Sequence, residues 1–312
     1  MTKEIKLANP RGFCAGVDRA IDIVNKALDI YGAPVYVKHE VVHNKVVVND
    51  LKQRGAIFVE DINEIPDESL VIFSAHGVSS QVEETTRFRN LNYFDATCPL
   101  VTKVHMEVIK HAKANKDIIL VGHQGHPEVE GTMGRHINSQ NSSIYLVQDE
   151  QDAKNIEIAN GTNLALVTQT TLSVDETKSI IEILKNRFPN INIPKKDDIC
   201  YATQNRQDAV KQLALESDYM IVVGSKNSSN SNRLKELAEK CGCKSILIDE
   251  FADLDLEELS AYTNISITAG ASAPESRVIE IAESLKDYIG AEILEYGNDN
   301  ENIYFKLPAE LR

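Results

Sequence analysis

Three cysteines occupy positions from which their thiolates could act together. Cys14 lies in the Pro/Gly-rich turn of "LANPRGFCAGVDRA", Cys98 precedes a proline, and Cys200 follows "PKKDDI". Each stands just before an expected helix, whose positive dipole end lowers the thiol pKa. Three thiolates could bind zinc together with a fourth ligand or a water. They could equally hold a cubane iron–sulfur cluster and leave one iron without a protein ligand.

Structural burial is the plainer use of any single cysteine, because cysteine is among the most often buried residue types. Burial explains three equivalent positions in three segments less well than a shared metal centre does. Cys241 and Cys243, in "EKCGCKS", close a helix through a Gly turn and have no equivalents elsewhere in the chain. We interpret these two as incidental.

Polar loops follow the strands that we expect after each cysteine. The first loop in each segment carries one polar residue at nearly the same interval from its cysteine: His43, His126 and Ser228. A later strand-to-helix loop carries another: His76, Thr170 and Ser272. Gly and Ser in these loops let backbone N–H groups face an anion, and hydroxyls, amides and imidazoles add donors. The loops therefore predict a pocket for a phosphate or diphosphate, although none has the P-loop or dinucleotide-binding spacing.

A carboxyl group in one of these loops could supply protons. "GHPEVEG" contains Glu128 and Glu130. A carboxyl desolvated beside an anion has a raised pKa and can act as a general acid. The spacing alone does not choose between the two glutamates.

The elements that must position these residues alternate between strand and helix along the whole chain, as in α/β proteins with parallel sheets. One cysteine with two polar loops occurs three times, which predicts three similar α/β lobes in a trefoil-like, pseudo-threefold arrangement. We place lobe one at 1–97, lobe two at 98–197 and lobe three at 198–290, with a C-terminal tail at 291–312. Because ligands bind at the carboxyl ends of parallel strands, we expect the loops to converge on one central site.

Composition excludes several functional classes. The chain has 312 residues and a formal net charge of −14, which argues against binding to nucleic acid or to an anionic membrane. The N-terminus lacks a signal-peptide pattern, and no apolar run approaches the ~20 residues that a membrane span needs. Five cysteines, an odd number in such a chain, favour metal binding or catalysis over disulfides. We therefore expect a cytoplasmic protein.

Longer motifs along the chain resemble one known family. These are "LANPRGFCAGVDRAI", "VVHN", "FSAHGVS", "FDATCPLVTKVH", "GHPEVEGT", "TQTTLSV", "DDICYATQNRQ", "GSKNSSNSNRL" and "TAGASAP". Together they resemble the 4-hydroxy-3-methylbut-2-enyl diphosphate reductases, the IspH or LytB family, over nearly the whole chain. The resemblance implies three α/β lobes around a central iron–sulfur cluster.

The resemblance also implies a role for each matching residue. Cys14, Cys98 and Cys200 match the cysteines that hold a [4Fe–4S] cluster whose fourth iron stays open to substrate. The residues that match the binding site for the substrate diphosphate are His43, His76, His126, Ser228, Ser229, Asn230 and Ser272. Glu128 matches the acid that delivers protons, which decides between it and Glu130. Thr170 matches a hydroxyl that contacts the substrate and helps to relay protons.

The implied reaction converts 4-hydroxy-3-methylbut-2-enyl diphosphate to isopentenyl and dimethylallyl diphosphate, the last step of the methylerythritol phosphate route to isoprenoids. It requires a one-electron donor protein, a ferredoxin or a flavodoxin. One alternative is a zinc-dependent hydrolase or isomerase of a phosphorylated metabolite, built on His43, His76, His126 and Glu128. A second alternative is an iron–sulfur redox sensor, which would need no diphosphate-binding loops. Metal and sulfide analysis separates the zinc enzyme from the other two.

Overall fold

The computed structural model describes residues 3–136, 141–158, 161–194, 196–298 and 301–312. The chain divides into two compact units. Unit 1 consists of Met1–Asp18, His43–Asp50 and Tyr201–Tyr304, and unit 2 of Arg19–Val42, Leu51–Cys200 and Phe305–Arg312.

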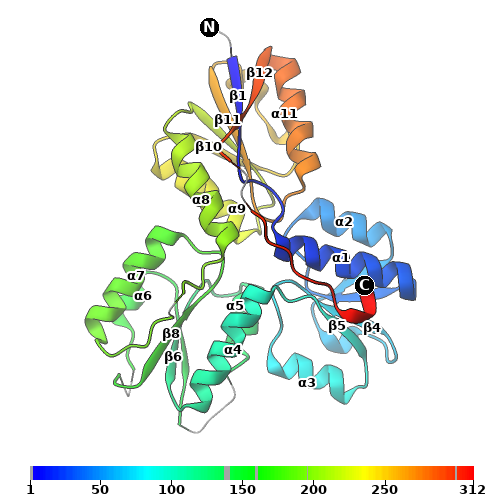
Figure 1. The fold of residues 1–312 in the computed structure, drawn as a ribbon, viewed down its shortest axis with the longest axis vertical. Coiled ribbons are helices and arrows are strands. Elements are labelled where there is room, and N and C mark those ends of the chain that lie inside the picture. The colour runs from blue at the N-terminus through cyan, green and yellow to red at the C-terminus, as the bar shows by residue number, and fades with distance from the viewer. Residues whose placement is uncertain (1–2, 137–140, 159–160, 195, 299–300) are drawn as a thin grey trace. The chain divides into compact units, whose positions relative to one another are not determined.

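Unit 1 is built on one five-stranded, fully parallel sheet in the order β10-β9-β11-β1-β12 (Figure 1). Its strands are β1 Lys3–Ala8, β9 Tyr219–Val223, β10 Lys244–Ile248, β11 Asn264–Ala269 and β12 Ala291–Tyr296. Its complete helices are α8 Tyr201–Ala214, α9 Ser229–Lys240, α10 Leu256–Leu259 and α11 Glu275–Ile289. A short 3₁₀ helix covers Phe251–Asp253.

Both faces of this sheet are covered, which is why β9 is continuously apolar. In β9, Ile221 and Val223 belong to the core that includes α11, whereas Met220 and Val222 belong to the core formed with α8 and α9. All five residues of β9 are buried. This strand therefore lies between β10 and β11 with helices packed on both of its faces.

Two strands differ from the predicted lobes. The first strand is expected in lobe one and residues 291–312 are expected to form a tail, but β1 lies between β11 and β12 in the sheet of unit 1. β1 pairs with β12 from Lys3↔Ala291 to Ala8↔Tyr296. β12 is an edge strand with one buried residue in six, so it lacks the apolar run of a central strand. Pairing between distant segments leaves no local signal in either sequence.

Unit 2 contains two parallel sheets, of order β3-β2-β4-β5 and β7-β6-β8. The first consists of β2 Val35–Lys38, β3 Ala56–Val59, β4 Leu70–Phe73 and β5 Asn92–Asp95. The second consists of β6 Asp117–Val121, β7 Ile144–Val147 and β8 Leu164–Thr168.

The helices contained in unit 2 are α3 Ser80–Phe88, α4 Pro99–Lys113, α5 Pro127–Met133, α6 Glu150–Asn155 and α7 Val174–Arg187. Helices α1 Ala15–Tyr31 and α2 Lys45–Gln53 begin in unit 1 and end in unit 2. Further 3₁₀ helices cover Ile62–Glu64 and Ala309–Leu311. None of the helices in the described ranges is long and apolar enough to cross a membrane.

The three-stranded sheet has helices on both faces. Ile119 and Val121 of β6 belong to the core with α6 and α7, whereas Ile118 and Leu120 belong to the core with α4 and α5. The alternation along β6 places two helices on each face, as in other parallel α/β sheets. The α/β class and the three separate parallel sheets that the sequence predicts are thus confirmed.

The candidate residues share one position in these sheets. The polar loops follow the carboxyl ends of the strands β2, β4, β6, β8, β9 and β11. The turn that contains Cys14 follows β1, and Cys98 follows β5. In a parallel sheet these ends lie along one edge, where α/β proteins bind their ligands. Each sheet therefore collects its candidate residues at a single edge.

Candidate functional site

The three cysteines have the same local setting. Each immediately precedes a helix: α1, α4 or α8. Each backbone N–H donates a hydrogen bond to a loop that follows a strand: Cys14 to the Ala271 carbonyl at 3.2 Å, Cys98 to that of Ala75 at 3.0 Å, and Cys200 to that of Thr170 at 3.0 Å. The five cysteines are present as thiols. The repeated hydrogen bond sets each thiol beside a polar loop at the positive end of a helix.

Burial raises the pKa of Cys14, which disfavours its thiolate. Hydrogen bonds from the backbone N–H groups of Val17 and Gly16 and the charge of Arg206 act in the opposite direction. The helix start and a nearby guanidinium thus compensate part of the desolvation of this sulfur.

In unit 1, the polar candidates form one hydrogen-bonded group. The Ser272 hydroxyl donates to the His43 carbonyl at 3.0 Å and lies 3.5 Å from the Ser228 hydroxyl. Asn230 accepts the backbone N–H of Ala271 at 3.0 Å. Ser228, Asn230 and Ser272 are buried, and Ser229 is partly buried at the first position of α9. The loops after β9 and β11 and the start of α2 are therefore joined at one edge of this sheet.

In unit 2, the His76 and His126 rings lie edge to face, with centroids 5.7 Å apart. His126 is the N-cap of α5, and its Nδ1 accepts the backbone N–H of Glu128 at 3.1 Å. In the neutral ring the proton is therefore on Nε2, the form that donates to an anion. The start of α5 thus combines an imidazole donor with a helix N-terminus.

Glu128 is enclosed in the same unit and bonded to Thr170 through both carboxyl oxygens. The Thr170 backbone N–H lies 2.6 Å from Oε1, and its Oγ1 lies 3.0 Å from Oε2. Burial raises the pKa of Glu128 to about 7, and the hydrogen bonds from Thr170 limit the increase. Glu130 is exposed on the same helix. The structure thus distinguishes two glutamates that the spacing leaves equivalent.

The predicted residues fall into one set in each unit. Unit 1 contains Cys14, His43, Ser228, Ser229, Asn230 and Ser272. Unit 2 contains Cys98, His76, His126, Glu128, Thr170 and Cys200. Among the residues that the structure describes, no three His, Cys, Asp or Glu side chains form a compact metal-ion site. Each set therefore has cysteine and diphosphate-binding candidates, whereas the proton-donor candidates belong to unit 2.

Two charged residues near the cysteines were missed by the sequence analysis. Arg206 is fully buried on α8, where its spacing from Ala202 and Val210 places a charge on the buried helix face. Asp198, two residues before Cys200, accepts the Thr168 backbone N–H at 3.1 Å and pairs with Lys103 at 3.0 Å. A charge on an otherwise apolar helix face could have revealed Arg206, but no local pattern marks Asp198.

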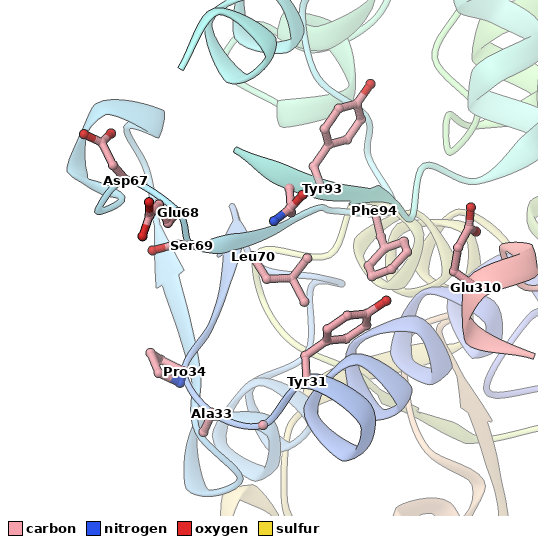
Figure 2. A pocket seen from close by; sticks show the side chains of 12 residues that line it. Tyr31, Ala33, Pro34, Asp67, Glu68, Ser69, Leu70, Tyr93, Phe94 and Glu310 are labelled. Atoms are coloured by element: carbon pink, nitrogen blue, oxygen red, sulfur yellow. The ribbon is translucent and has the colours of Figure 1, made fainter. Parts of the chain in front are cut away.

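A hollow of about 640 Å³ lies elsewhere in unit 2 (Figure 2). Its lining includes Tyr31, Phe94, Asp67, Glu68 and Glu310, and the Tyr31 and Phe94 rings lie with centroids 5.7 Å apart (Figure 2). Leu70 and Asn92, also in its lining, begin β4 and β5. The hollow is therefore at the amino ends of strands whose carboxyl ends carry His76 and Cys98, and it is separate from the candidate site.

The chain is similar to known proteins of one family. The model of the LytB protein family matches residues 5–286. A protein of Saccharophagus degradans named 4-hydroxy-3-methylbut-2-enyl diphosphate reductase is 60% identical over 309 residues, covering 99% of both chains. A protein of the same name from Marinobacter nauticus is 58% identical over 309 residues, covering 99% of this chain and 98% of the other.

Solved structures lead to the same family. The E-1-hydroxy-2-methyl-but-2-enyl-4-diphosphate reductase of Plasmodium falciparum superposes with a TM-score of 0.94 at 38% identity, covering 100% of this chain and 97% of that one. A structure titled (E)-4-hydroxy-3-methyl-but-2-enyl diphosphate reductase, the terminal enzyme of the non-mevalonate pathway, matches with a TM-score of 0.64 at 30% identity over 91% of this chain and 99% of that one. By its motifs, its fold and its full-length similarity, this chain belongs to the LytB family.

Proposed function

We propose that this protein is a 4-hydroxy-3-methylbut-2-enyl diphosphate reductase. It is an oxidoreductase that replaces the allylic hydroxyl of its substrate with hydrogen, giving isopentenyl and dimethylallyl diphosphate at the end of the non-mevalonate route. Full-length relatives with this name support the assignment. The observation in the structure that carries it is the buried Glu128–Thr170 pair beside the start of α5, because it can hold a transferable proton near neutral pH.

The reaction requires an electron-transfer group, and we propose a [4Fe–4S] cluster held by Cys14, Cys98 and Cys200. The donor set is suitable because all three are thiols and each stands at a helix start with its amide anchored to a loop. Cluster irons in proteins are bound chiefly by cysteine thiolates. When bound, such a cluster would supply electrons one at a time, and three protein ligands would leave its fourth iron open to substrate.

The polar loops would hold the diphosphate. The proposed ligands are His43, His76, His126, Ser228, Ser229, Asn230 and Ser272. Helix starts at α5 and α9 add backbone N–H groups and positive dipole ends, which favour an anion. Support comes from the Nε2–H form of His126 and from the joined hydroxyl and amide groups at the edge of unit 1.

Glu128 would donate protons, and Thr170 would relay them to the substrate. A Glu128 carboxyl with a pKa of about 7 is partly protonated at neutral pH and can donate to Thr170 Oγ1, whose own hydrogen then passes to the substrate. Overall, two electrons and two protons are consumed. One proton leaves with the hydroxyl group as water, and the other ends on carbon. Because either end of an allylic fragment can accept that proton, two products form.

The electron donor and the location of the reaction complete the proposal. Two electrons delivered singly call for a one-electron carrier, and we propose a ferredoxin or a flavodoxin. We propose the cytoplasm as the location, where thiols remain reduced. The competing zinc hydrolase would use His43, His76, His126 and Glu128 as ligands. One observation argues against the zinc hydrolase: both carboxyl oxygens of Glu128 already accept hydrogen bonds from Thr170.

The deciding experiment is metal and sulfide analysis of protein purified without oxygen, followed by a substrate assay with a chemical one-electron donor. We expect about four irons and four labile sulfides per chain and both isoprenoid diphosphates as products. Zinc without sulfide would overturn the reductase and favour the hydrolase. An intact cluster without turnover of the substrate would favour the redox sensor.

A further inference from the structure

Arg206 is the bulkiest of the fully buried side chains in the described structure, with 0% exposure. It lies on α8, which starts directly after Cys200. A guanidinium group removed from water needs a counter-charge and acceptors for its five N–H donors. Such a costly group in the core of unit 1 requires a structural or functional reason.

Two of its three nitrogen atoms, Nε and Nη2, donate to the turn that contains Cys14. Arg206 Nη2 and Nε donate to the Gly12 carbonyl at 2.7 and 3.1 Å, and Nη2 also lies 3.3 Å from the Phe13 carbonyl. Nη1 donates to Glu301 Oε1 at 3.0 Å and to the Ala202 carbonyl at 3.1 Å. The guanidinium therefore holds the two carbonyls that immediately precede Cys14 and is balanced by one carboxylate.

The same turn is held from a second side. The backbone N–H of Gly12 donates to the Ala269 carbonyl at 3.3 Å, and that of Cys14 donates to the Ala271 carbonyl at 3.2 Å. Gly12 has φ +69°, and a Cβ added there would lie 3.2 Å from the Ala273 carbonyl oxygen. The turn thus lies between α8 and the loop after β11, and the Arg206 guanidinium makes the contacts from α8.

Tyr201 adds a further contact from α8, because its hydroxyl accepts the backbone N–H of Ala15 at 3.2 Å. Helix α8 therefore contacts residues on both sides of Cys14. Glu301 comes from the C-terminal segment, and it also accepts the Asn205 side-chain amide at 2.9 Å. Its side chain is only 11% exposed, so the ion pair with Arg206 is largely shielded from water.

We propose that Arg206 is the positioning residue of Cys14, fixing the direction of this thiol through the carbonyls of Gly12 and Phe13, with Glu301 as the counter-charge that keeps the guanidinium in place. The proposal deepens the proposed function, since Cys14 matters as a cluster ligand. Groups that orient metal ligands from behind commonly affect metal retention. Lysine cannot replace the arginine, because an ammonium lacks the planar fork that spans two carbonyls and a carboxylate.

The test compares R206K, R206M and E301Q with the control R89K in the full-length protein. Arg89 is a close chemical match, because its guanidinium also donates to two carbonyls, of Ile62 and Ile65, and to a carboxylate, Asp67. It belongs to unit 2, whereas the turn of Cys14 belongs to unit 1. R206K keeps the charge and loses the fork, so it separates geometry from electrostatics.

Two readouts are measured. The first is the rate at which a chelator removes iron from anaerobically purified protein. The second is the rate at which iodoacetamide alkylates each cysteine of the iron-free full chain, resolved by peptide mass spectrometry. We expect R206K and R206M to lose iron about tenfold faster than wild type, and their Cys14 alkylation to change while Cys98 and Cys200 stay within about twofold. In E301Q the rate of iron loss and the rate of Cys14 alkylation should change in the same direction as in R206K. In R89K both rates should match those of wild type.

The proposal is overturned if R206K leaves Cys14 alkylation unchanged, or if all cysteines change together in R206K and R89K alike, since that pattern indicates general loosening. If R206M fails to fold, R206K and E301Q still test the positioning role of Arg206. If wild-type protein holds no iron but R206K alters Cys14 alone, the positioning role stands and the proposed cofactor fails. The two ideas therefore fail in different ways.

Discussion

At the scale of single residues, burial separates Glu128 from Glu130 although both lie on α5. Only 3% of Glu128 is exposed, and desolvation raises its pKa to about 7. The same hydrogen bonds from Thr170 that limit the rise provide a route for the proton. The proposed role of Glu128 as proton donor therefore has a physical basis that Glu130 lacks.

We expect E128Q to lower kcat by about a hundredfold or more, which is the usual contribution of a general acid, while iron content stays at the wild-type level. The amide keeps the shape and the hydrogen-bond acceptor but has no acidic proton. Turnover and iron are measured on the same anaerobic sample. E130Q is the matched control and should remain near wild type. Near-normal turnover in E128Q would remove Glu128 from the mechanism.

The pKa of Glu128 also predicts a pH dependence. Its value in the folded protein, about 7, exceeds the ordinary 4.5, so between these values the native state binds more protons than the unfolded state. The free energy of unfolding therefore falls as pH rises through this window, by on the order of 3 kcal/mol in total. Urea unfolding from pH 5 to 8 should show this loss in wild type and not in E128Q. Equal pH profiles for the two proteins would contradict the raised pKa.

At the scale of elements, glycines let functional segments of unit 2 approach each other closely. A Cβ on Gly131 of α5 would lie 3.2 Å from the Gly77 carbonyl oxygen, and one on Gly77 would lie 2.6 Å from Cε1 of His105 in α4. The loop that carries His76 is thus packed against both the helix that follows Cys98 and the helix that carries Glu128. Close backbone packing of these elements sets where their side chains meet.

We expect G77A to destabilise the protein by about 2–4 kcal/mol, from left-handed strain and overpacking together, and to raise KM by displacing His76. G125A is a matched control, because Gly125 has φ +79° and nothing lies within 4 Å of an added Cβ. G125A should therefore show the left-handed backbone strain without a steric clash of the added Cβ. Urea unfolding and steady-state kinetics measure the two effects. Equal losses in the two variants would show that the contact with His105 is unimportant.

At the scale of the whole molecule, unit 1 is assembled from distant parts of the chain. Its sheet combines β1 and β12 with strands from the third predicted lobe. Ile5 of β1 is fully buried among residues of β9, β11 and α11. The first residues of the chain therefore complete the core on which the loops of Cys14 and Ser272 rest.

We expect I5A to lower the free energy of unfolding by about 2–5 kcal/mol, as a cavity in a close-packed core does. Hydrogen exchange should accelerate in β9 and β11 together, because they share that core. Ile57 in β3 is 41% exposed, and I57A should cost little. Unchanged protection of β9 in I5A would contradict the assignment of β1 to this core.

Local patterns along the chain predict the chemistry of the site and the class of fold. Cysteine before helix, polar loop after strand and continuous apolar strands are local patterns, and each reflects local physics such as helix dipoles, turn residues and burial on two faces. These patterns predict the parallel α/β sheets, a metal centre on the three cysteines and anion binding by the polar loops. The choice of Glu128, by contrast, came from family resemblance.

Which distant segments pair and which charges are buried becomes visible in the folded chain. Three contacts join residues that are far apart in the chain. β1 pairs with β12, Thr170 donates hydrogen bonds to the buried Glu128, and Arg206 donates hydrogen bonds to the Gly12 carbonyl. Pairing and desolvation depend on which surfaces meet in three dimensions. No window of neighbouring residues encodes them, and they set the proton affinity of Glu128 and the orientation of Cys14.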